Sequence, residues 1–390
     1  MKKIILSLVS LMLCAGLYAQ ETLKIGIIGL DTSHSTAFSK LINTGNEEWS
    51  KGFKVVAAYP YGSQTIKSSY ERIPKYIDEV KTYGVEVVGS IQELLDKVDC
   101  VFLETNDGRL HLEQALEVFK AGKKVFIDKP VGATLADAIA IYAMAEKYGI
   151  KTFSSSALRF SSANVAARAG EYGKIIGADC YSPHKNEPTH PDYGFYGIHG
   201  VESLYTVMGT GCKEVCCMSS ELGDVVVGKW EDGRIGTFRA IVKGPNGYGG
   251  TILSEKKKFS PAGKYEGYKP LLKEVLDFFR TDVLPVSNEE TIEIFTFMKA
   301  ANMSKAKGGQ AVSLEEAYKA GNKEAKKLII WSPATSDMTI DANQNIIAYF
   351  ASRTRYIAAK IPAMGKIAVR CIPNATKQNA MPIDNLPSSR

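Results

Sequence analysis

Short apolar runs alternate with longer amphipathic stretches between residues 23 and 155. The apolar runs predict β-strands, and they read LKIGIIGL, FKVVAAY, VEVVGS, DCVFLET, KKVFID and KTFSSS. Between them, stretches such as RLHLEQALEVFKAG and TLADAIAIYAMAEKYG carry apolar residues at helical spacing. Because such alternation is typical of a parallel sheet covered on both faces, residues 21–155 are expected to form a doubly wound α/β domain of the Rossmann type. Ligands of such sheets bind at the carboxyl ends of the strands, where the strand order reverses.

The pattern changes after about residue 156. The runs KIIGADCYS, EVCCMSS, DVVVGKW and RIGTFRAIV predict strands of a mostly antiparallel sheet, with Asp232-Gly233 as a hairpin turn. Three stretches predict helices on one face of that sheet, namely GIHGVESLYTVMG, YKPLLKEVLDFFRT and ETIEIFTFMKAANMSKA. Residues 156–328 are therefore expected to form an α+β domain with a large open sheet.

Both ends of the chain differ from these domains. Residues 1–20, MKKIILSLVSLMLCAGLYAQ, have a basic start and an apolar core too short to span a bilayer, which predicts a secretion signal. We expect a periplasmic protein, and lipidation at Cys14 is disfavoured because bulky Leu13 precedes it. Residues 329–390 are basic, contain prolines and lack helical periodicity, so we expect a C-terminal extension of unknown role.

Charge and composition exclude several classes of protein. The formal net charge of the 390 residues is +6, and the charges are spread out without a basic stripe, which argues against nucleic-acid binding. After residue 20 no run is long and apolar enough for a membrane span. The cluster CKEVCC lacks paired C-x-x-C spacing, and we assign no metal site from the sequence.

The loop GLDTSH follows the first predicted strand, where dinucleotide-binding chains carry G-x-G-x-x-G. Gly29 is present, but Asp31 and His34 occupy the positions of the second and third glycines. The Asp31 carboxylate should repel a phosphate, whereas Thr32, Ser33 and His34 could donate hydrogen bonds to one. In the alternative interpretation, Asp31 or Thr32 simply caps the following helix.

Two further strand ends carry candidate ligand contacts. The second strand ends in AAYPYGSQ without the usual acidic residue for a ribose, and Ser63 there is compatible with either NAD or NADP, or with an ordinary turn. After the fourth strand, LETNDGRLH offers Asn106, Arg109 and His111 at the expected ligand edge. His111 could equally be a helix-start residue that binds the backbone.

Lys129 follows the strand KKVFI and precedes a proline in DKP. A lysine at the end of a parallel strand is held near the ligand edge, where its ammonium can donate to a substrate hydroxyl and to a ribose. We therefore expect Lys129 to act on a ligand rather than to be a solvated surface residue.

These motifs together resemble the Gfo/Idh/MocA oxidoreductase family. The resemblance rests on AGKKVFIDKP against the family's [ED]-K-P, on Asn106 and His111, on Arg159 in LRF, and on YGIHGVE against D-x-G-x-H-x-x-D. Tyr196 replaces the first aspartate of the last pattern. The resemblance implies NAD or NADP as cofactor, a CH–OH group as the site of reaction, and a homo-oligomer formed through the open sheet.

The resemblance also implies roles for individual residues. His199 is the expected general base opposite Lys129, because an imidazole with a reference pKa near ~6.5 accepts a proton at neutral pH. Glu202 shares its helix face and is expected to orient the ring or contact substrate. The expected substrate-binding residues are Arg109, Arg159, Tyr181, His184, Lys185, His190, Tyr193 and Tyr196, with Asp192 as a further candidate. A metal site of His184, His190 and His199 is the less favoured alternative, because no spacing enforces it.

Two functions are compatible with these observations. The first is a nicotinamide-dependent oxidoreductase that acts on a secondary hydroxyl of a sugar or other polyol, including a variant that holds its cofactor and uses it twice around an elimination or epimerisation. The second is a non-catalytic module that binds a carbohydrate or small ligand on the same scaffold. Asp31 and the missing ribose acid favour the second function, and the retention of Lys129 and His199 favours the first.

Overall fold

The computed structural model describes residues 22–185, 187–191 and 193–331 of the chain. The predicted secretion signal, Asp192, Cys371 and residues 332–390 of the predicted extension lie outside the described residues. The helix α12 runs from Leu314 to Trp331 and thus includes the first residues of that segment.

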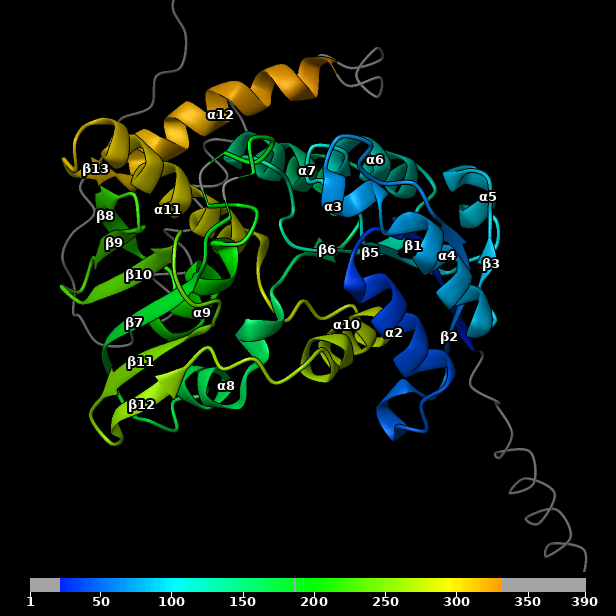
Figure 1. Cartoon of the computed structure of the whole chain (residues 1–390), viewed down its shortest axis with the longest axis horizontal. Coiled ribbons are helices and arrows are strands. Elements are labelled where there is room, and N and C mark those ends of the chain that lie inside the picture. The colour runs from blue at the N-terminus through cyan, green and yellow to red at the C-terminus, as the bar shows by residue number, and fades with distance from the viewer. Residues whose placement is uncertain (1–21, 186, 192, 332–390) are drawn as a thin grey trace, which may run out of the picture. The chain divides into compact units, whose positions relative to one another are not determined.

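The first domain is built on a parallel six-stranded sheet with the order β3-β2-β1-β4-β5-β6 (Figure 1). Its strands are β1 (Leu23–Ile28), β2 (Phe53–Tyr59), β3 (Glu86–Val87), β4 (Cys100–Leu103), β5 (Lys124–Ile127) and β6 (Thr152–Phe153). All six fall within the predicted apolar runs, so the predicted Rossmann-type sheet is confirmed. Because the order reverses between β1 and β4, the loops after these two strands flank the expected ligand position.

Helices connect these strands and cover both faces of the sheet (Figure 1). They are α2 (Ser33–Asn43), the 3₁₀ helix η1 (Glu48–Ser50), α3 (Lys67–Tyr70), α4 (Ile73–Thr82), α5 (Ile91–Leu95), α6 (His111–Lys120) and α7 (Leu135–Lys147). The start of α7 is fixed by a capping box, in which Thr134 and Asp137 each bind the other's backbone N–H.

The second domain is built on a seven-stranded sheet with the order β12-β11-β7-β10-β9-β8-β13. Its strands are β7 (Ile175–Pro183), β8 (Cys212–Ser220), β9 (Gly223–Trp230), β10 (Ile235–Ile241), β11 (Gly249–Ser254), β12 (Lys258–Ala262) and β13 (Val312–Ser313). Only β7 and β10 pair in parallel, so the predicted mostly antiparallel sheet is confirmed. The predicted hairpin turn joins β9 to β10, with Gly233 at a φ of 85°.

Two long helices cover one face of the second sheet. Helix α9 (Ile198–Met208) and helix α11 (Asn288–Ala306) bring Tyr205 and Phe297 against Trp230 of the sheet. The other helical segments are η2 (Ala157–Phe160) and α8 (Ser162–Arg168), which follow β6. The opposite face exposes large apolar side chains, including Met218 and Phe259, which are 81% and 74% exposed.

The helix α10 (Lys269–Thr281) was expected on the second sheet, and this prediction is wrong. Its apolar residues belong to the core of the first domain, where Phe279 stacks on Phe102 and Phe278 meets Phe153 edge to face. Figure 1 shows α10 beside α2, next to the parallel sheet. The aromatic residues of β4, β5 and β6 leave an apolar face there, and the amphipathic helix buries its stripe against it. The chain thus returns to the first domain after the second sheet.

The described helices give no sign of a membrane segment: among residues 22–331 as described, none is both long and apolar enough to cross a bilayer.

Candidate active site

A cavity of about 220 Å³ lies where the two domains meet, at the carboxyl ends of the parallel strands. Its lining residues come from both domains: Thr32, Ser33, His34, Arg72, Asn106, Asp128, Lys129, Ser156, Ala157, Leu158, Tyr196, His199, Tyr248, Tyr265 and Tyr268. Lys129 and His199 therefore share one cavity, although they lie in different domains. Of the predicted site residues, Thr32, Ser33, His34, Asn106 and Tyr196 line it too.

Lys129 is positioned by the end of β5. Its backbone N–H donates to Asp128 Oδ1 at 2.8 Å, and its peptide bond to Pro130 is cis. The ammonium nitrogen lies 6.0 Å from the centre of the Tyr196 ring. Within the described part of the chain the ammonium forms no ion pair, so its donors are available to a ligand in the cavity.

His199 sits in the first turn of α9, with Nδ1 2.7 Å from Ser156 Oγ. The Ser156 hydroxyl oxygen also accepts the Leu158 N–H, which fixes the serine in place. Burial holds the pKa of His199 well below its usual range, and the positive charges of Lys129 and His34 lower it further. The imidazole is therefore neutral at pH 7, which is the state that a general base requires.

Glu202 lies one helical turn further on and does not contact the His199 ring. Its carboxylate accepts hydrogen bonds from Ser155 Oγ at 2.5 Å, from Ser156 N–H at 2.8 Å and from Arg159 Nε at 2.7 Å. Arg159 is itself buried, and its other side binds Glu290 at 2.7 Å. In this structure Glu202 and Arg159 hold the segment that carries Ser156, and their predicted roles toward substrate stay predictions.

The aromatic and histidine-rich segment before α9 contributes less to the cavity than the sequence suggested. Tyr193 is buried with its hydroxyl on Asp224 at 2.8 Å, and the His184 ring packs on Tyr193. The buried His190 accepts the Gly108 N–H at Nε2, and burial lowers its pKa to about 4. His190 therefore supports the loop after β4 through its contact with Gly108.

Tyr181 and Lys185, the remaining members of that set, lie differently. Tyr181 is 39% exposed on the second sheet, where the glycine at position 249 passes close to its hydroxyl. Lys185 places its ammonium 4.6 Å from the centre of the Tyr196 ring. Tyr196 lines the cavity, whereas Lys185 is not among the lining residues. The structure does not bring His184, His190 and His199 together as a ligand set among the described residues.

Asp31 closes the loop after β1. Its carboxylate is fully buried and accepts Asn106 N–H at 3.0 Å and Ser63 N–H at 3.1 Å, so one side chain joins the loops after β1, β2 and β4. A Cβ on Gly62 would lie 2.1 Å from Asp31 Oδ2, which explains the glycine there. Burial raises the pKa of Asp31 to about 6, against the opposing effect of its two backbone donors.

Thr32 occupies the N-cap position of α2, as this alternative predicted, but in the described structure neither Asp31 nor Thr32 caps the helix with its side chain. The Asp31 carboxylate accepts hydrogen bonds from the neighbouring loops. In the described structure the hydroxyl of Thr32 has no hydrogen-bond partner. The tightness of the loop comes from Gly29, which has a φ of 93° and whose Cβ would lie 2.6 Å from Thr105 N. The first turn of α2 therefore faces the cavity with its backbone N–H groups uncapped by a side chain among the described residues.

Most other predicted ligand contacts of the strand ends bind protein groups. Ser63 Oγ donates to Asp107 Oδ2 at 2.8 Å, and Asn106 Nδ2 donates to Ser69 Oγ at 2.8 Å. Arg109 pairs with Asp107 at 2.6 Å. His111 is buried between the carbonyl oxygens of Thr105 and Val131, 2.6 Å and 3.2 Å from its ring nitrogens, in agreement with the helix-start interpretation.

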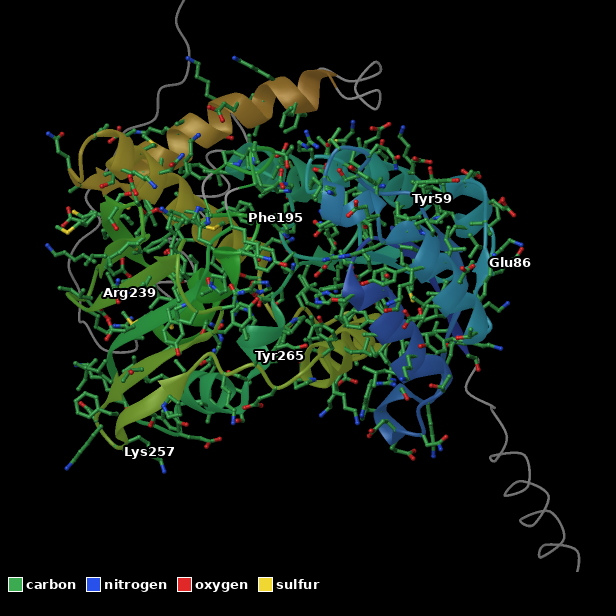
Figure 2. The ribbon with its side chains drawn as sticks, viewed as in Figure 1. Tyr59, Glu86, Phe195, Arg239, Lys257 and Tyr265 are labelled. Atoms are coloured by element: carbon green, nitrogen blue, oxygen red, sulfur yellow. The ribbon has the colours of Figure 1, made fainter. Side chains whose placement is uncertain are left out.

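The sequence reasoning missed several lining residues. Ser156 follows β6, and three tyrosines form an aromatic wall: Tyr248 contacts the His199 ring, while Tyr268 contacts the His34 ring and hydrogen-bonds Ser33 Oγ at 3.0 Å. Figure 2 shows Tyr265 between the two domains, on the segment before α10. A density of tyrosines around a loop was visible in GPNGYGG and GKYEGYK, but only the fold brings them to the cavity.

Two buried carboxylates at strand ends were also missed. Glu104 follows β4 and Asp128 follows β5, and both are 0% exposed. His34 Nδ1 lies 2.9 Å from Asp128 Oδ1 and 3.7 Å from Glu104 Oε2. Burial raises the pKa of Glu104 well above its usual range, and the charge of Asp128 raises it further. Burial also raises the pKa of Asp128, but His34 and Lys129 outweigh it and hold that pKa below its usual range. An acid directly after an apolar strand was the signal in FLET and FID.

A larger and more open hollow of about 750 Å³ lies beside α8 and β12. It is lined by Glu171, Lys257 and Glu266 among others and contains neither Lys129 nor His199. We therefore assign the chemistry to the smaller cavity, where buried charged groups converge.

Comparison with known proteins supports the Rossmann-type fold of the first domain. Residues 23–155 match the sequence model of the Gfo/Idh/MocA family, described as an oxidoreductase family with an NAD-binding Rossmann fold. The chain is 32% identical over 111 residues to the uncharacterized oxidoreductase YhhX of Escherichia coli, which covers 25% of this chain and 32% of that protein. It is 29% identical over 170 residues to 1,5-anhydro-D-fructose reductase of Ensifer adhaerens, covering 39% of this chain and 50% of that protein. The chain thus spans half or less of the length of these curated relatives.

The whole fold has counterparts among solved structures. The scyllo-inositol dehydrogenase of Lactobacillus casei, solved with NAD(H) and scyllo-inositol, superimposes with a TM-score of 0.59 at 16% identity, over 76% of this chain and 100% of that one. At that identity the likeness establishes the shared two-domain fold. The family match covers residues 23–155, which are the domain of the parallel sheet.

The residues at the site can be tested against such a cofactor. Lys129 and His199 fit its reactive end, because they offer donors and a neutral base around one cavity. The loops that would take its diphosphate and adenosine do not fit in this conformation. Asp31 occupies two of their N–H groups and adds a carboxylate, and Ser63 and Asn106 bind protein groups.

Proposed function

We propose that the chain is an NAD- or NADP-dependent oxidoreductase that acts on a secondary hydroxyl of a sugar or another polyol. The observation that carries this proposal is the convergence of Lys129 and His199 on one cavity at the carboxyl edge of the parallel sheet. The family of the N-terminal domain and the relatives named above support it.

The two side chains suit the proton chemistry of alcohol oxidation. The Lys129 ammonium is available as a donor to the reacting oxygen and would stabilise alkoxide character on it. The neutral His199 can take the hydroxyl proton, and an Nδ1–H bond to Ser156 would leave its other ring nitrogen free for that purpose. When bound, the nicotinamide would supply the hydride acceptor.

The walls of the cavity suit a carbohydrate ring. Tyr196, Tyr248, Tyr265 and Tyr268 offer aromatic faces and hydroxyl groups together. Sugar rings present apolar C–H faces that pack on aromatic rings and hydroxyls that need hydrogen-bond partners. A volume of about 220 Å³ accommodates one small ring rather than an extended chain.

The second candidate is a non-catalytic module that binds a carbohydrate or another small ligand in the same cavity. The observation that favours it is the pair of hydrogen bonds from Ser63 N–H and Asn106 N–H to the Asp31 carboxylate, which occupies the diphosphate region with protein groups. The convergence of Lys129 and His199 on the same cavity opposes this candidate and favours the enzyme.

One experiment separates these candidates. The full chain is purified, its absorbance is scanned for a copurified dinucleotide, and its unfolding temperature is measured with and without NAD and NADP. The oxidoreductase proposal predicts a bound dinucleotide or a rise in unfolding temperature with one of the two. If neither is seen, while polyols alone stabilise the chain, the binding module replaces the enzyme.

We further propose that the protein is exported and forms a homo-oligomer. Export rests on residues 1–20, and the oligomer on the exposed apolar face of the second sheet with Met218 and Phe259. The mass of the mature N-terminus in a periplasmic extract tests the first proposal. Light scattering of wild type and Met218→Lys tests the second, since a charge on an interface would yield monomers.

A further inference from the structure

Three strand ends bring one imidazole and two carboxylates to a single point. His34 comes from the start of α2, Glu104 from the end of β4 and Asp128 from the end of β5. One ligand atom from each residue lies within 4.8 Å of the other two. All three side chains are buried, with exposed fractions of 6%, 0% and 0%.

The polar atoms of this cluster are not satisfied by protein groups. Among the described residues, both oxygens of Glu104, Oδ2 of Asp128 and Nδ1 of His34 lack a hydrogen-bond partner. Burying polar groups without hydrogen-bond partners is unfavourable. Two adjacent buried carboxyl groups with unpartnered oxygens form a ligand set that a bound cation would satisfy.

A protonated His34 does not resolve the cluster. Its Nδ1 is 2.9 Å from Asp128 Oδ1, yet the geometry is not that of a hydrogen bond in the described structure. The ring is held by stacking on Phe38 at 5.4 Å and by Tyr268 at 4.4 Å, which restrict its rotation toward either acid. One imidazolium also cannot place a proton on both Glu104 oxygens.

The distances match the spacing of ligands around a metal ion. Metal–ligand bonds of about 2.0–2.2 Å place two ligands at right angles ~3 Å apart, and wider angles give slightly more. The observed separations of 2.9 Å and 3.7 Å from His34 Nδ1 to the two carboxylates fall in this range.

The cluster also has an open side. His34 and Asp128 line the cavity together with Lys129 and His199, so a cation held here would face the ligand space. One nitrogen and two carboxylate oxygens suit borderline divalent ions such as Mn²⁺ or Zn²⁺, and three protein ligands leave positions for water or a substrate oxygen.

We propose that His34, Glu104 and Asp128 form a binding site for a divalent metal ion at the floor of the cavity. The ion neutralises the buried carboxylates and offers an open coordination position to a hydroxyl or carboxylate oxygen of the substrate. The site stands where the third glycine of a dinucleotide loop would be, because His34 occupies that position. Metal binding does not depend on the proposed oxidoreductase activity.

The test is direct metal binding by the full chain. Protein treated with a chelator and dialysed is titrated with Mn²⁺, with free Mn²⁺ followed by electron paramagnetic resonance, and with Zn²⁺ by calorimetry. We expect about one ion per chain. Glu104→Gln and Asp128→Asn should each weaken binding by more than the ~10–100-fold typical of changes outside the ligand shell. Asp137→Asn, which removes a buried carboxylate in the capping box of α7, should leave the affinity unchanged.

Unfolding temperatures provide a second readout. Wild type should gain stability with Mn²⁺, whereas Glu104→Gln should gain stability without metal, because it removes one of two adjacent buried carboxylates, and should lose the response to Mn²⁺. Absence of stoichiometric binding of either ion, or affinity that both ligand variants retain, overturns the proposal. Dinucleotide binding is measured on the same samples, so failure of the metal site and failure of the oxidoreductase proposal are separate results.

Discussion

Two halves of the same strand edge differ in how they use their polar groups. Around β5 and α9, Lys129 and His199 point functional groups into a cavity and keep them available. Around β1 and β2, the side chains of Asp31 and Ser63 instead form hydrogen bonds with neighbouring loops. Polar groups at one end of this edge thus face a cavity, whereas those at the other end form hydrogen bonds within the protein.

The largest expected effect is on turnover in the available half. Lys129→Ala should lower kcat on a polyol substrate by ~10²–10⁴-fold, since it removes the donor that stabilises alkoxide character, with little change in unfolding temperature. Lys185→Ala is the control, because that ammonium also lies near the Tyr196 ring but Lys185 is not among the residues that line the cavity. Equal losses in both variants would mean that general charge, not position, matters.

Glu202→Gln should act on stability instead. It breaks a buried ion pair with Arg159, and the loss of one partner from such a pair typically costs ~3–5 kcal/mol. Urea unfolding measures the effect. The variant at Glu290, which shares Arg159, should behave alike; a loss of turnover with unchanged stability would return Glu202 to a catalytic role.

Asp31→Asn tests the hydrogen-bonded loops around β1 and β2 through the pH dependence of the free energy of unfolding. The pKa of Asp31 is raised from 3.8 to about 6, so the folded state binds the extra proton between these values, and its stability falls as pH rises through them. The wild-type free energy of unfolding, relative to the variant, should thus fall by about 2 kcal/mol between pH 4 and 7. Urea unfolding at several pH values checks this, and a constant difference contradicts it.

The same variant should bind a dinucleotide more tightly, because it removes a negative charge from the diphosphate region while keeping the size of the side chain. A thermal-shift titration with NAD measures this effect. Weaker binding by Asp31→Asn would show that the carboxylate is a positive contact, and that the two halves of the edge act together.

The smallest effect is expected at Ser156. Ser156→Ala removes the hydrogen bond to His199 Nδ1 and should lower kcat by about fivefold, in line with the ~1 kcal/mol of a typical hydrogen bond. Because the pKa of His199 is well below 6.5, the wild-type rate should show no acid limb from this residue between pH 6.5 and 8. An acid limb near neutrality would indicate a protonated histidine in the resting site.

Sequence patterns predicted that Lys129 and His199 share a site, and both line one cavity in the structure, whereas their chemical roles stay predictions. Lys129 was recognised because it ends a strand before proline, and His199 because it begins a helix in a family pattern. Arg159, Tyr193 and His190 have the residue types of ligand contacts, yet each is buried and bonded to the protein. Their partners are the Glu202 carboxylate, the Asp224 carboxylate and the Gly108 N–H, respectively. A polar residue type does not reveal whether its partner is a ligand or the protein itself.

The sequence alone determined the alternation of strands and helices, the parallel and mostly antiparallel sheets, and the place of Lys129 at a strand end, because these follow from local periodicity. Only the tertiary structure decided that α10 returns to the first domain, that Asp31 braces three loops, and that His34, Glu104 and Asp128 meet. These contacts join residues far apart in the chain, and their energies depend on burial and on the identity of the partner, neither of which a local pattern contains.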